Sequence, residues 1–366
     1  MDRIVLSTGG TGGHIFPALA VAERIQESFP HADLMFVGGD QGPEGRLAQE
    51  AGLSFVGLPA RGVLGRGLRS LGSAWWMIRS FVRCWRTYSR FRPQVVVGFG
   101  SYASFVPVLV ASWKWIPAAI HEQNAYPGVT NRVLSKRVQR IFLSFPDDQE
   151  WFDPDRVRVT GNPVRTSLIH LRDKEKVYTH QIGHRVLVLG GSQGAQAINQ
   201  AMVKALPQLL PRGVQVLHQA GERHYAELSE HYQGYDPGQA RVVPFIQNMA
   251  EAYAWSDLVV SRAGASTVAE LTVIGRPSVL IPFPYAVHHH QLHNAKLLEK
   301  AGAALVIEQS YLPEVNLADI ILDLLALPEK LVAMGRAARR LGQPAATRSI
   351  VLELEKLAAK KGKTGS

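Results

Sequence analysis

The stretch Ser7-Thr8-Gly9-Gly10-Thr11-Gly12-Gly13-His14 separates an apolar run, Ile4-Val5-Leu6, from an apolar-periodic segment that extends to Phe29. This order predicts a strand, a glycine-rich turn and a helix, with Pro17 in the first helical turn, where its missing N–H costs nothing. Glycines let the backbone approach a ligand and point N–H groups at it, and the adjoining helix N-terminus favours an anion. The sequence therefore predicts an anion-binding loop after the first strand.

His14 closes this loop and adds a group that takes up a proton near neutral pH. A dinucleotide-binding fingerprint would need glycine where Ile15 stands, and no Gly-Lys-Ser/Thr follows as in a Walker loop. Asp40, at the end of the expected second strand, could still bind a ribose. A nicotinamide-dependent oxidoreductase therefore stays open as the weaker alternative.

Length and composition predict two domains with sizeable cores, because the chain has 366 residues of which 46% are hydrophobic. No run of about 18 uninterrupted apolar residues occurs, so no membrane-spanning helix is expected. Met1-Asp2-Arg3 leads directly into the first strand, so no signal peptide is expected either. The single cysteine, Cys84, excludes a disulfide within the chain and fits a reducing cytoplasm.

The net charge of +10 predicts an anionic partner, and its distribution indicates which kind. No acidic residue lies between Glu50 and Glu122, whereas arginines crowd a predicted helix from about Ser70 to Arg90. The common nucleic-acid-binding motifs are absent, which argues against a nucleic-acid partner. An arginine stripe beside bulky aromatic residues is instead typical of a helix that lies on an anionic phospholipid surface.

The apolar face of this helix consists of Leu71, Trp75, Ile78, Val82 and Trp85. A core helix with a solvated charged edge would explain that face. It would not explain why Trp76, Met77 and Phe81 lie outside the face, or why no acid balances the arginines. We therefore expect membrane contact through Trp75, Trp76, Arg79, Phe81, Arg83 and Arg86.

Strand-like and helix-like segments alternate along both halves of the chain, which predicts parallel sheets covered by helices on both faces. A boundary is expected between Arg156 and Thr166, after which the pattern restarts. There Arg185–Leu189 leads into Gly190-Gly191-Ser192-Gln193-Gly194-Ala195, which resembles the opening unit. The predicted fold class is α/β, with two similar domains, 1–160 and 161–344, whose parallel sheets face a central cleft.

A second glycine-containing segment, Ser261-Arg262-Ala263-Gly264-Ala265-Ser266-Thr267, follows a predicted strand and opens a helix. Small residues there would let a diphosphate approach the helix N-terminus. Glu270, one turn further on, could accept both hydroxyls of a ribose or could simply interact with the helix dipole. His288, His289 and His290 are consecutive, so their side chains point in different directions, and we expect no metal site.

Five segments occur in one order along nearly the whole chain: Thr8 to His14, His121-Glu122-Gln123-Asn124, Gly190 to Ala195, Ser261 to Ala265, and Gln291-x-x-Asn294-Ala295. By these segments the chain resembles the MurG family, within glycosyltransferase family 28. The resemblance implies the GT-B architecture of two Rossmann-like domains, with the final helix, about 345–360, packing back on the first. It also implies a peripheral position at the cytoplasmic face of the bacterial inner membrane.

The activity that the resemblance implies is inverting transfer of N-acetylglucosamine from UDP-N-acetylglucosamine to the C4 hydroxyl of undecaprenyl-pyrophosphoryl-N-acetylmuramyl-pentapeptide. His14 is the first candidate for the base and Glu122 the second. The sequence has no clustered Asp-x-Asp, so no cofactor and no tightly bound metal are expected. Other possibilities are a related UDP-sugar glycosyltransferase with another lipid or soluble acceptor, and a non-catalytic protein that binds a membrane surface.

The resemblance also implies the binding residues. Ser192 and Arg165 would hold the diphosphate, Ile246 the uracil and Gln291 the sugar hydroxyls. The full implied donor set is Thr11, Gly12, Gly13, Asn124, Arg165, Ser192, Ile246, Ala265, Ser266, Thr267, Val268, Ala269, Glu270 and Gln291. The acceptor diphosphate would meet the first domain at Gly100, Ser101, Tyr102 and Asn124.

Overall fold

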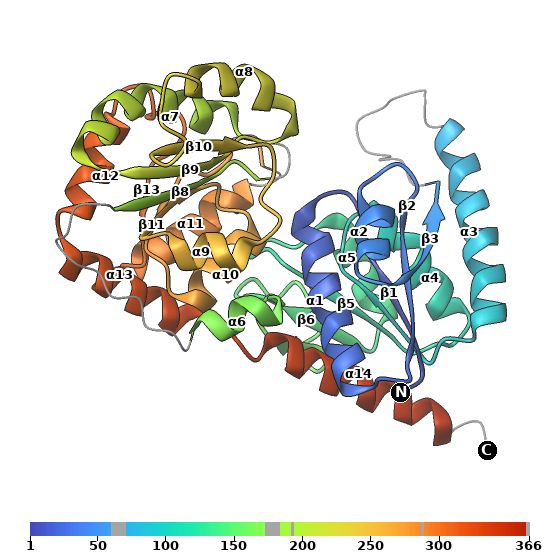
Figure 1. Ribbon diagram of the computed structural model, residues 1–366. Coiled ribbons are helices and arrows are strands. Elements are labelled where there is room, and N and C mark those ends of the chain that lie inside the picture. Colours follow the sequence, from blue (N-terminus) through green and yellow to red (C-terminus); the bar gives the residue numbers. More distant parts are fainter. Residues whose placement is uncertain (60–70, 173–183, 192–193, 287–288, 364–366) are drawn as a thin grey trace. The chain divides into compact units, whose positions relative to one another are not determined.

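Figure 1 shows the computed structural model, which describes residues 1–59, 71–172, 184–191, 194–286 and 289–363. The chain divides into two units, Met1–Thr166 with Pro344–Ser366, and Ser167–Gln343. Each unit is built around one parallel sheet with helices. The predicted α/β class with two parallel-sheet domains is therefore confirmed.

The first unit opens with β1 (Arg3–Ser7), and its strand order is β3-β2-β1-β4-β5-β6-β7. Its other elements, in chain order, are α1 (Gly12–Ser28), β2 (Asp33–Gly39), α2 (Glu44–Glu50), β3 (Ser54–Leu58), α3 (Leu71–Phe91), β4 (Val95–Gly98), η2 (Tyr102–Ser104), α4 (Phe105–Trp113), β5 (Ala118–Glu122), α5 (Val129–Leu134), η3 (Ser135–Arg137), β6 (Arg140–Leu143), β7 (Val157–Val159) and α14 (Ala346–Lys363). The sequence pattern predicts strands at Ile4–Leu6, Leu34–Val37, Ser54–Leu58, Gln94–Gly98, Ala118–His121 and Arg140–Leu143, which match β1 to β6 to within a few residues, but it does not predict β7.

The second unit has the strand order β10-β9-β8-β11-β12-β13. Its elements are β8 (Arg185–Leu189), α7 (Gln196–Leu209), η4 (Leu210–Arg212), β9 (Gln215–Gln219), α8 (Glu222–Tyr232), β10 (Ala240–Val243), α9 (Met249–Trp255), β11 (Leu258–Ser261), α10 (Ala265–Ile274), β12 (Ser278–Leu280), α11 (His290–Lys300), β13 (Ala304–Val306), α12 (Leu317–Leu325) and α13 (Pro328–Leu341). The short helix α6 (Thr166–Arg172) begins at the boundary of the two units. Counted within its own unit, this order repeats the 3-2-1-4-5-6 order of the first sheet.

The chain reverses its direction of strand addition between β1 and β4 in the first sheet, and between β8 and β11 in the second. Ligands of open α/β sheets bind outside the carboxyl ends of the strands at this switch point. The loops after these four strands contain the glycine-rich segments of the sequence. The topology therefore brings each unit's two most informative loops to one sheet edge.

The final helix belongs to the first unit, where α14 lies beside α1 in Figure 1. Ile350 and Leu354 of α14 share a buried cluster with Ile15 and Val21 of α1 and with Ile4 of β1. Burying an aliphatic side chain of this size contributes about 1.5–3 kcal/mol. This packing joins the last described helix of the chain to its first strand.

The prediction that Pro17 lies in the first helical turn is wrong. Helix α1 begins at Gly12, after the extended residue Thr11, so Pro17 is the sixth helical residue. The N–H of His14 already donates to the Thr11 carbonyl at 3.0 Å. Gly12 and Gly13 are therefore the start of the helix and not part of an irregular loop, which places His14 in its first turn.

Candidate active site

The loops after β1 and β4 lie against each other at the switch point of the first sheet. Gly10 has φ +87°, and a Cβ on it would come within 3.3 Å of the Ser101 Oγ. Gly100 has φ +81°, and a Cβ there would lie 3.1 Å from His14 Nδ1. Both positions need glycine, because a side chain would be strained by the backbone conformation and would crowd the neighbouring loop. The structure thus brings His14 together with the predicted acceptor-binding residue Gly100.

His14 is hydrogen-bonded through its ring. Nδ1 lies 3.0 Å from the side-chain oxygen of Gln123, which follows β5. The Gln123 amide nitrogen donates in turn to the Phe99 carbonyl at 2.9 Å. Gln123 is almost completely buried, so the imidazole is held by a side chain that has little freedom. The sequence reasoning missed Gln123 as a functional residue, although it stands inside the His121-Glu122-Gln123-Asn124 segment.

Glu122 is buried at the end of β5 with both carboxylate oxygens occupied. One oxygen accepts from the Asn124 backbone at 3.1 Å and from the Asn124 side chain at 3.3 Å. The other accepts from Gly128 N–H at 2.9 Å and from the Asn131 side chain at 2.8 Å. A carboxylate has about four acceptor positions, so loop donors saturate this one. The geometry makes Glu122 the anchor of the loop that carries Asn124, and favours His14 as the base.

Ser101 has φ +66° and ψ +160°, a backbone region that residues other than glycine rarely occupy. Its side chain is bonded locally, because its Oγ accepts from Ala103 N–H at 3.5 Å. Tyr102 beside it is exposed. Such strain costs on the order of 1–3 kcal/mol and clusters at ligand-binding loops. The conformation supports the expectation that this loop, which includes Gly100 to Tyr102, contacts a substrate.

A buried carboxylate holds the glycine loop after β1 in place. Glu44, the first residue of α2, is 1% exposed, and its Oε1 accepts from Gly10 N–H at 2.7 Å. Gly9, Gly38 and Gly42 leave room for it, since a Cβ on any of them would crowd the Glu44 side chain. Glu44 therefore fixes the loop that precedes Thr11, Gly12 and Gly13. Glu44 lies 34 residues from Gly10, in the segment Gly42-Pro43-Glu44-Gly45, and no local sequence pattern indicates this contact.

In the second unit, Gln219 at the end of β9 connects two predicted donor loops. Its amide nitrogen donates to the Gly191 carbonyl at 3.1 Å, and its oxygen accepts from Ile246 N–H at 3.2 Å. Gln219 is buried, so the glycine segment after β8 and the segment that contains Ile246 are held in a fixed relation. Ser192, predicted to hold the diphosphate, lies outside the described residues.

Helix α10 begins at Ala265, after the extended residue Gly264, and no side chain caps its first turn. The amide groups of a helix's first turn have no partner within the helix and attract anions. Ser266 and Thr267 lie in that turn, as predicted. Val268 is buried, whereas Ala269 is partly exposed. The structure thus provides the predicted helix N-terminus, with the side chain of Val268 directed to the core.

Glu270, on the second turn of α10, receives a hydrogen bond from Tyr253 of α9, whose hydroxyl lies 2.9 Å from Glu270 Oε2. Tyr253 is completely buried. Its carbonyl accepts from the buried guanidinium of Arg276 at 2.8 Å. Tyr253 is therefore fixed at its backbone and at its hydroxyl, and it holds the Glu270 carboxylate. Sequence spacing alone does not show this contact.

Gln291 and Arg262 shape the loop after β12. The Gln291 oxygen accepts from Phe283 N–H at 3.0 Å, which leaves its amide NH₂ to donate elsewhere. Arg262 donates to the carbonyls of Ile281 and Pro282 at 3.0 and 3.2 Å. Burial lowers the pKa of Arg262 to about 10. Arg262 thus holds the loop in place, and Gln291 keeps donors of the kind that the predicted sugar contact requires.

Arg165, predicted to bind the diphosphate, belongs to the first unit. Its guanidinium lies 5.1 Å from the ring centre of Phe16 on α1, a cation–π geometry. Asn124 is partly exposed, with its side-chain nitrogen on Glu122. Thr11 is exposed before α1, and Gly12 and Gly13 are partly exposed. These predicted donor-binding residues of the first unit are therefore at least partly accessible.

Helix α3 exposes the apolar stripe that the sequence analysis weighed as either a core face or part of a membrane contact. Trp75 is 64% exposed and Ile78 55%, and Val82 and Trp85 are exposed too. The buried side is made by Ser80, Cys84 and Tyr88. Trp76 and Phe81, which are also expected at the membrane, are partly buried and pack against the buried cluster of the first unit. Small residues at positions 80 and 84 let α3 approach the domain closely, and Trp75, Ile78, Val82 and Trp85 face outward.

The exposed apolar residues of α3 adjoin a groove of about 360 Å³ lined by Phe81, Val82, Trp85, Arg86 and Trp113. Lys114 Nζ lies 4.0 Å from the Trp85 ring centre, and Arg79, Arg83 and Arg86 are exposed along the helix. We name the set Trp75, Ile78, Arg79, Val82, Arg83, Trp85, Arg86, Trp113 and Lys114 the α3 surface. Within the described ranges, no helix is long and apolar enough to cross a membrane.

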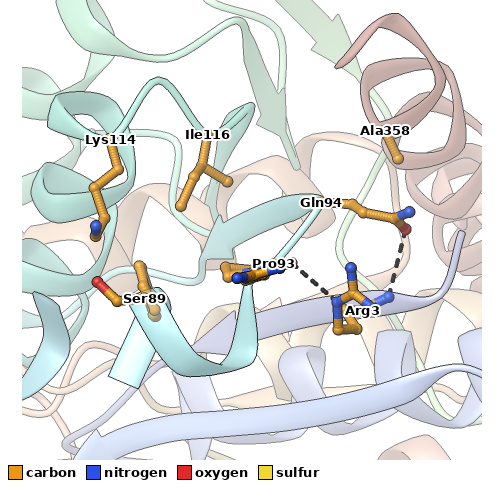
Figure 2. A pocket seen from close by; sticks show the side chains of 9 residues that line it. Arg3, Ser89, Pro93, Gln94, Lys114, Ile116 and Ala358 are labelled. Atoms are coloured by element: carbon orange, nitrogen blue, oxygen red, sulfur yellow. Dashed lines mark hydrogen bonds between the residues drawn. The ribbon is translucent and has the colours of Figure 1, made fainter. Parts of the chain in front are cut away.

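A larger cavity, of about 590 Å³, lies at the amino ends of the strands of the first sheet, away from the glycine loops (Figure 2). Its lining includes Arg3 at the start of β1, Arg92 after α3 and Lys114 after α4. Basic side chains are favourable at helix C-termini, where the helix dipole is negative, and this accounts for Arg92 and Lys114. The cavity is remote from the glycine loops, because it lies at the amino ends of β1 and β4.

Comparison with known proteins identifies the family. The model of the glycosyltransferase family 28 N-terminal domain matches residues 4–143, and that of the C-terminal domain matches residues 185–350. A relative from Nitratidesulfovibrio vulgaris (strain Miyazaki F) is 49% identical, with 100% of both chains covered. A relative from Solidesulfovibrio magneticus is 47% identical, over 99% of this chain and 100% of its own. Both are named UDP-N-acetylglucosamine–N-acetylmuramyl-(pentapeptide) pyrophosphoryl-undecaprenol N-acetylglucosamine transferase.

Solved structures agree with the sequence relatives. The crystal structure of Acinetobacter baumannii MurG is similar with a TM-score of 0.74 and 31% identity, over 97% of this chain and 100% of that one. A UDP-GlcNAc 2-epimerase from Neisseria meningitidis reaches a TM-score of 0.66 at 14% identity, over 97% and 100% of the two chains, and so shares the fold alone. The chain belongs to glycosyltransferase family 28, with both domains of that family and full-length similarity to its MurG members.

Proposed function

We propose that this protein transfers N-acetylglucosamine from UDP-N-acetylglucosamine to the C4 hydroxyl of undecaprenyl-pyrophosphoryl-N-acetylmuramyl-pentapeptide. The observation that carries the proposal is the 49% identity, over the whole length of both chains, to a relative named for this transfer. The loops at both switch points supply the chemistry that such a reaction needs. Its product is a β-1,4-linked disaccharide, because the configuration at the donor carbon inverts.

The donor half of the proposed site lies in the second unit. Glu270 accepts hydrogen bonds from the ribose hydroxyls, Ile246 offers backbone groups to the uracil, and Gln291 donates to the sugar through its amide NH₂. The first turn of α10 meets the diphosphate, since first-turn amides have no partner within their helix and lie at the positive end of its dipole. From the first unit, Thr11, Gly12, Gly13, Asn124 and Arg165 complete the donor contacts in this proposal.

The acceptor half is the switch-point region of the first unit, where Gly100, Ser101, Tyr102 and Asn124 contact the lipid-linked substrate. His14 takes the proton of the C4 hydroxyl while the hydroxyl oxygen forms its bond to C1 of N-acetylglucosamine. The bond from C1 to the diphosphate oxygen breaks, and UDP leaves with the electron pair. Amides at the α10 N-terminus and Arg165 stabilise the charge that develops on UDP, so the proposed mechanism needs no tightly bound metal or other cofactor.

The α3 surface is the proposed membrane contact. It combines exposed tryptophans and aliphatic side chains with a row of arginines, and it lies in a 71-residue stretch, 51–121, without an acid. Such a surface suits anionic phospholipid at the cytoplasmic face of the inner membrane, where the polyprenyl acceptor would be held. In this proposal the protein is peripheral, and nucleic acid is not a partner.

A UDP-release assay tests the proposed function directly. Purified protein should release UDP from UDP-N-acetylglucosamine when the lipid-linked muramyl pentapeptide is added, and the disaccharide product should appear in equal amount. Release with soluble sugars or other glycolipids, and none with the muramyl acceptor, would instead identify a related glycosyltransferase. Vesicle binding without any UDP release would identify a non-catalytic membrane protein.

His14→Ala tests the assignment of the base. Turnover should fall about 10²–10⁴-fold, the usual contribution of a general base, while the affinity for UDP-N-acetylglucosamine stays near that of the parent. Single-turnover kinetics and calorimetry measure the two quantities separately. If His14→Ala turns over normally and Glu122→Gln is inactive with an intact fold, the base is Glu122.

A further inference from the structure

His14, Gln123 and Phe99 form a chain of hydrogen bonds across three elements of the first unit. His14 lies in the first turn of α1, Gln123 follows β5 and Phe99 follows β4. The Nδ1 to Oε1 distance is 3.0 Å, and the Nε2 to carbonyl distance is 2.9 Å. Gln123 is 1% exposed and Phe99 is completely buried, so the chain is anchored in the domain and ends at a ring that is partly exposed.

The backbone carbonyl of Phe99 fixes the orientation of the glutamine amide. A carbonyl oxygen has no proton to donate, so the group that faces it must be the NH₂ of Gln123. The amide oxygen must then face His14. An amide oxygen only accepts hydrogen bonds, so the hydrogen between it and the ring must belong to Nδ1. A neutral imidazole has one N–H, and Nε2 therefore keeps its lone pair.

We propose that Gln123 is a positioning residue that holds neutral His14 in its Nδ1–H tautomer and so directs the basic Nε2 toward the acceptor. The inference rests on the proposed function, in which His14 is the base. The proton of the C4 hydroxyl goes to Nε2, the hydroxyl oxygen bonds to C1, and UDP departs with the electrons of the broken bond. The resulting imidazolium keeps its Nδ1–H on Gln123 and returns the other proton to solvent.

The titratable and charged side chains around His14 are neutral or engaged elsewhere, so the Gln123 amide is the group that orients the ring. His121 on β5 is buried, and burial lowers its pKa to about 4, so it is neutral at physiological pH. The Glu122 carboxylate is saturated by its loop, and Glu44 is engaged by Gly10. The guanidinium of Arg165 lies over Phe16. Gly100 leaves space for the ring, since a Cβ there would lie 3.1 Å from Nδ1.

The tautomer itself can be measured in the parent protein. With ¹⁵N-labelled histidine, the imidazole nitrogens of His14 are identified among the 13 histidines by their loss in His14→Ala. In the neutral ring, Nδ1 should give the signal of a protonated nitrogen and Nε2 that of an unprotonated one. The opposite assignment would overturn the proposal, whatever the variants do.

Gln123→Leu removes both hydrogen bonds at nearly constant volume. His14 should then populate both tautomers, and kcat should fall roughly 10- to 100-fold, a part of the general-base contribution, with KM for UDP-N-acetylglucosamine unchanged. Gln139→Leu is the matched control, because Gln139 bonds Ala118 N–H at the other end of β5, at 2.8 Å. It should change neither the His14 signals nor kcat.

The outcomes separate this inference from the proposed function. If Gln123→Leu keeps parental kcat or an unchanged tautomer, Gln123 does not position His14, and the transferase proposal stands. If His14→Ala turns over normally, the base assignment fails first, and the catalytic role of Gln123 fails with it. A folded Gln123→Leu variant that shows both the altered tautomer and the lowered kcat supports the proposal.

Discussion

Amide side chains connect the loops that form the candidate site in both units. Gln123 joins His14 to the Phe99 carbonyl, and Gln219 joins the Gly191 carbonyl to Ile246 N–H. An amide carries a donor and an acceptor at fixed spacing, so one side chain can bond two loops at once. Both glutamines follow or end a strand at the carboxyl edge of a sheet, where loops must be held without regular secondary structure.

His14 and His218, which bond to amide or hydroxyl groups, differ in one respect that matters for reactivity. His218 uses both ring nitrogens, with Nδ1 2.7 Å from the Tyr232 hydroxyl and Nε2 3.0 Å from Asn199 Oδ1. His218 is completely buried and serves the core of its unit. His14 has one bonded nitrogen and a partly exposed ring. A histidine with one nitrogen held and the other open is suited to proton transfer.

Tyr253→Phe should weaken UDP binding by removing the hydroxyl that holds Glu270 Oε2 at 2.9 Å. The loss should be roughly 3- to 10-fold, the scale of one hydrogen bond. It should disappear with 2′-deoxy-UDP and in a Glu270→Ala background, because the tyrosine acts through the carboxylate on the ribose hydroxyls. Calorimetric titration with UDP and with 2′-deoxy-UDP measures the effect of Tyr253→Phe in the parent and in the Glu270→Ala variant.

Tyr232→Phe is the control for this experiment. It removes another buried hydroxyl from the same unit, one that bonds His218 at 2.7 Å. Thermal stability should fall while UDP affinity stays parental. Equal weakening of UDP and 2′-deoxy-UDP by Tyr253→Phe would show a general disturbance of the loop. Parental UDP affinity in Glu270→Ala would remove Glu270 from the site altogether.

At the scale of elements, helix α3 shows that a stripe of large apolar residues need not be the buried face of a helix. A stripe of large apolar residues usually marks the buried side, yet here Ser80, Cys84 and Tyr88 face the core. Trp75, Ile78, Val82 and Trp85 are on the outside, together with the arginines. An exposed apolar patch of this kind on a monomer marks an interaction surface. These exposed residues form the apolar part of the α3 surface.

Changing Arg79, Arg83 and Arg86 to Gln should weaken binding to anionic vesicles by at most about 1 kcal/mol per charge. Raising the salt concentration should have the same effect, since these exposed charges act through a screened field. Trp75→Ser or Trp85→Ser should also weaken binding to neutral vesicles, because those contacts are apolar. Vesicle co-sedimentation at two salt concentrations measures each effect.

The matched control changes Arg212, Arg223 and Arg241 to Gln, three exposed arginines of the second unit. It removes the same net charge from a different surface and should leave vesicle binding nearly unchanged. Equal losses in both triple variants would mean that net charge alone, and not the α3 surface, attracts the protein. UDP affinity should stay constant in every vesicle-binding variant.

The strands and their grouping into two sheets could be predicted because buried parallel strands are short apolar runs with glycine turns after them, as at Val95–Gly98. The start of α1 could not be predicted. Gly12 and Gly13 have low helix propensity, and tertiary structure overrides that propensity here. Gln123 lies 109 residues from His14, and only the fold brings them together. Glu44 and Tyr253 likewise act through contacts that no local pattern records.

Across the whole chain, the two units share one strand order but place different functional groups at its switch point. Both sheets place glycine-containing loops at the switch point, but the first adds a histidine and the second a helix N-terminus followed by a carboxylate. Each unit also encloses a neutral histidine. Burial lowers the pKa of His121 to about 4 and that of His218 to about 3. This shared feature makes the stability of both units sensitive to acid.

Stability should therefore decrease as pH falls below about 6.5, the unfolded pKa of histidine. Below that pH the unfolded chain binds a proton at each of these positions and the folded chain does not. Each histidine then costs about 1.4 kcal/mol per pH unit, until its folded pKa of about 4 or about 3 is reached. Urea unfolding at pH 7.5, 6.5, 5.5 and 5.0 measures the slope, and an equal midpoint at all four values would contradict it.

His218→Gln provides the decisive variant, because glutamine can accept from Tyr232 and donate to Asn199 without becoming charged. It should be less stable than the parent at pH 7.5, since the ring packing is lost, but its unfolding midpoint should fall less steeply between pH 6.5 and 5.0. His31→Gln is the control, because His31 is exposed and should leave the slope unchanged. If His218→Gln keeps the parental slope, burial of a neutral His218 is not what makes the second unit sensitive to acid.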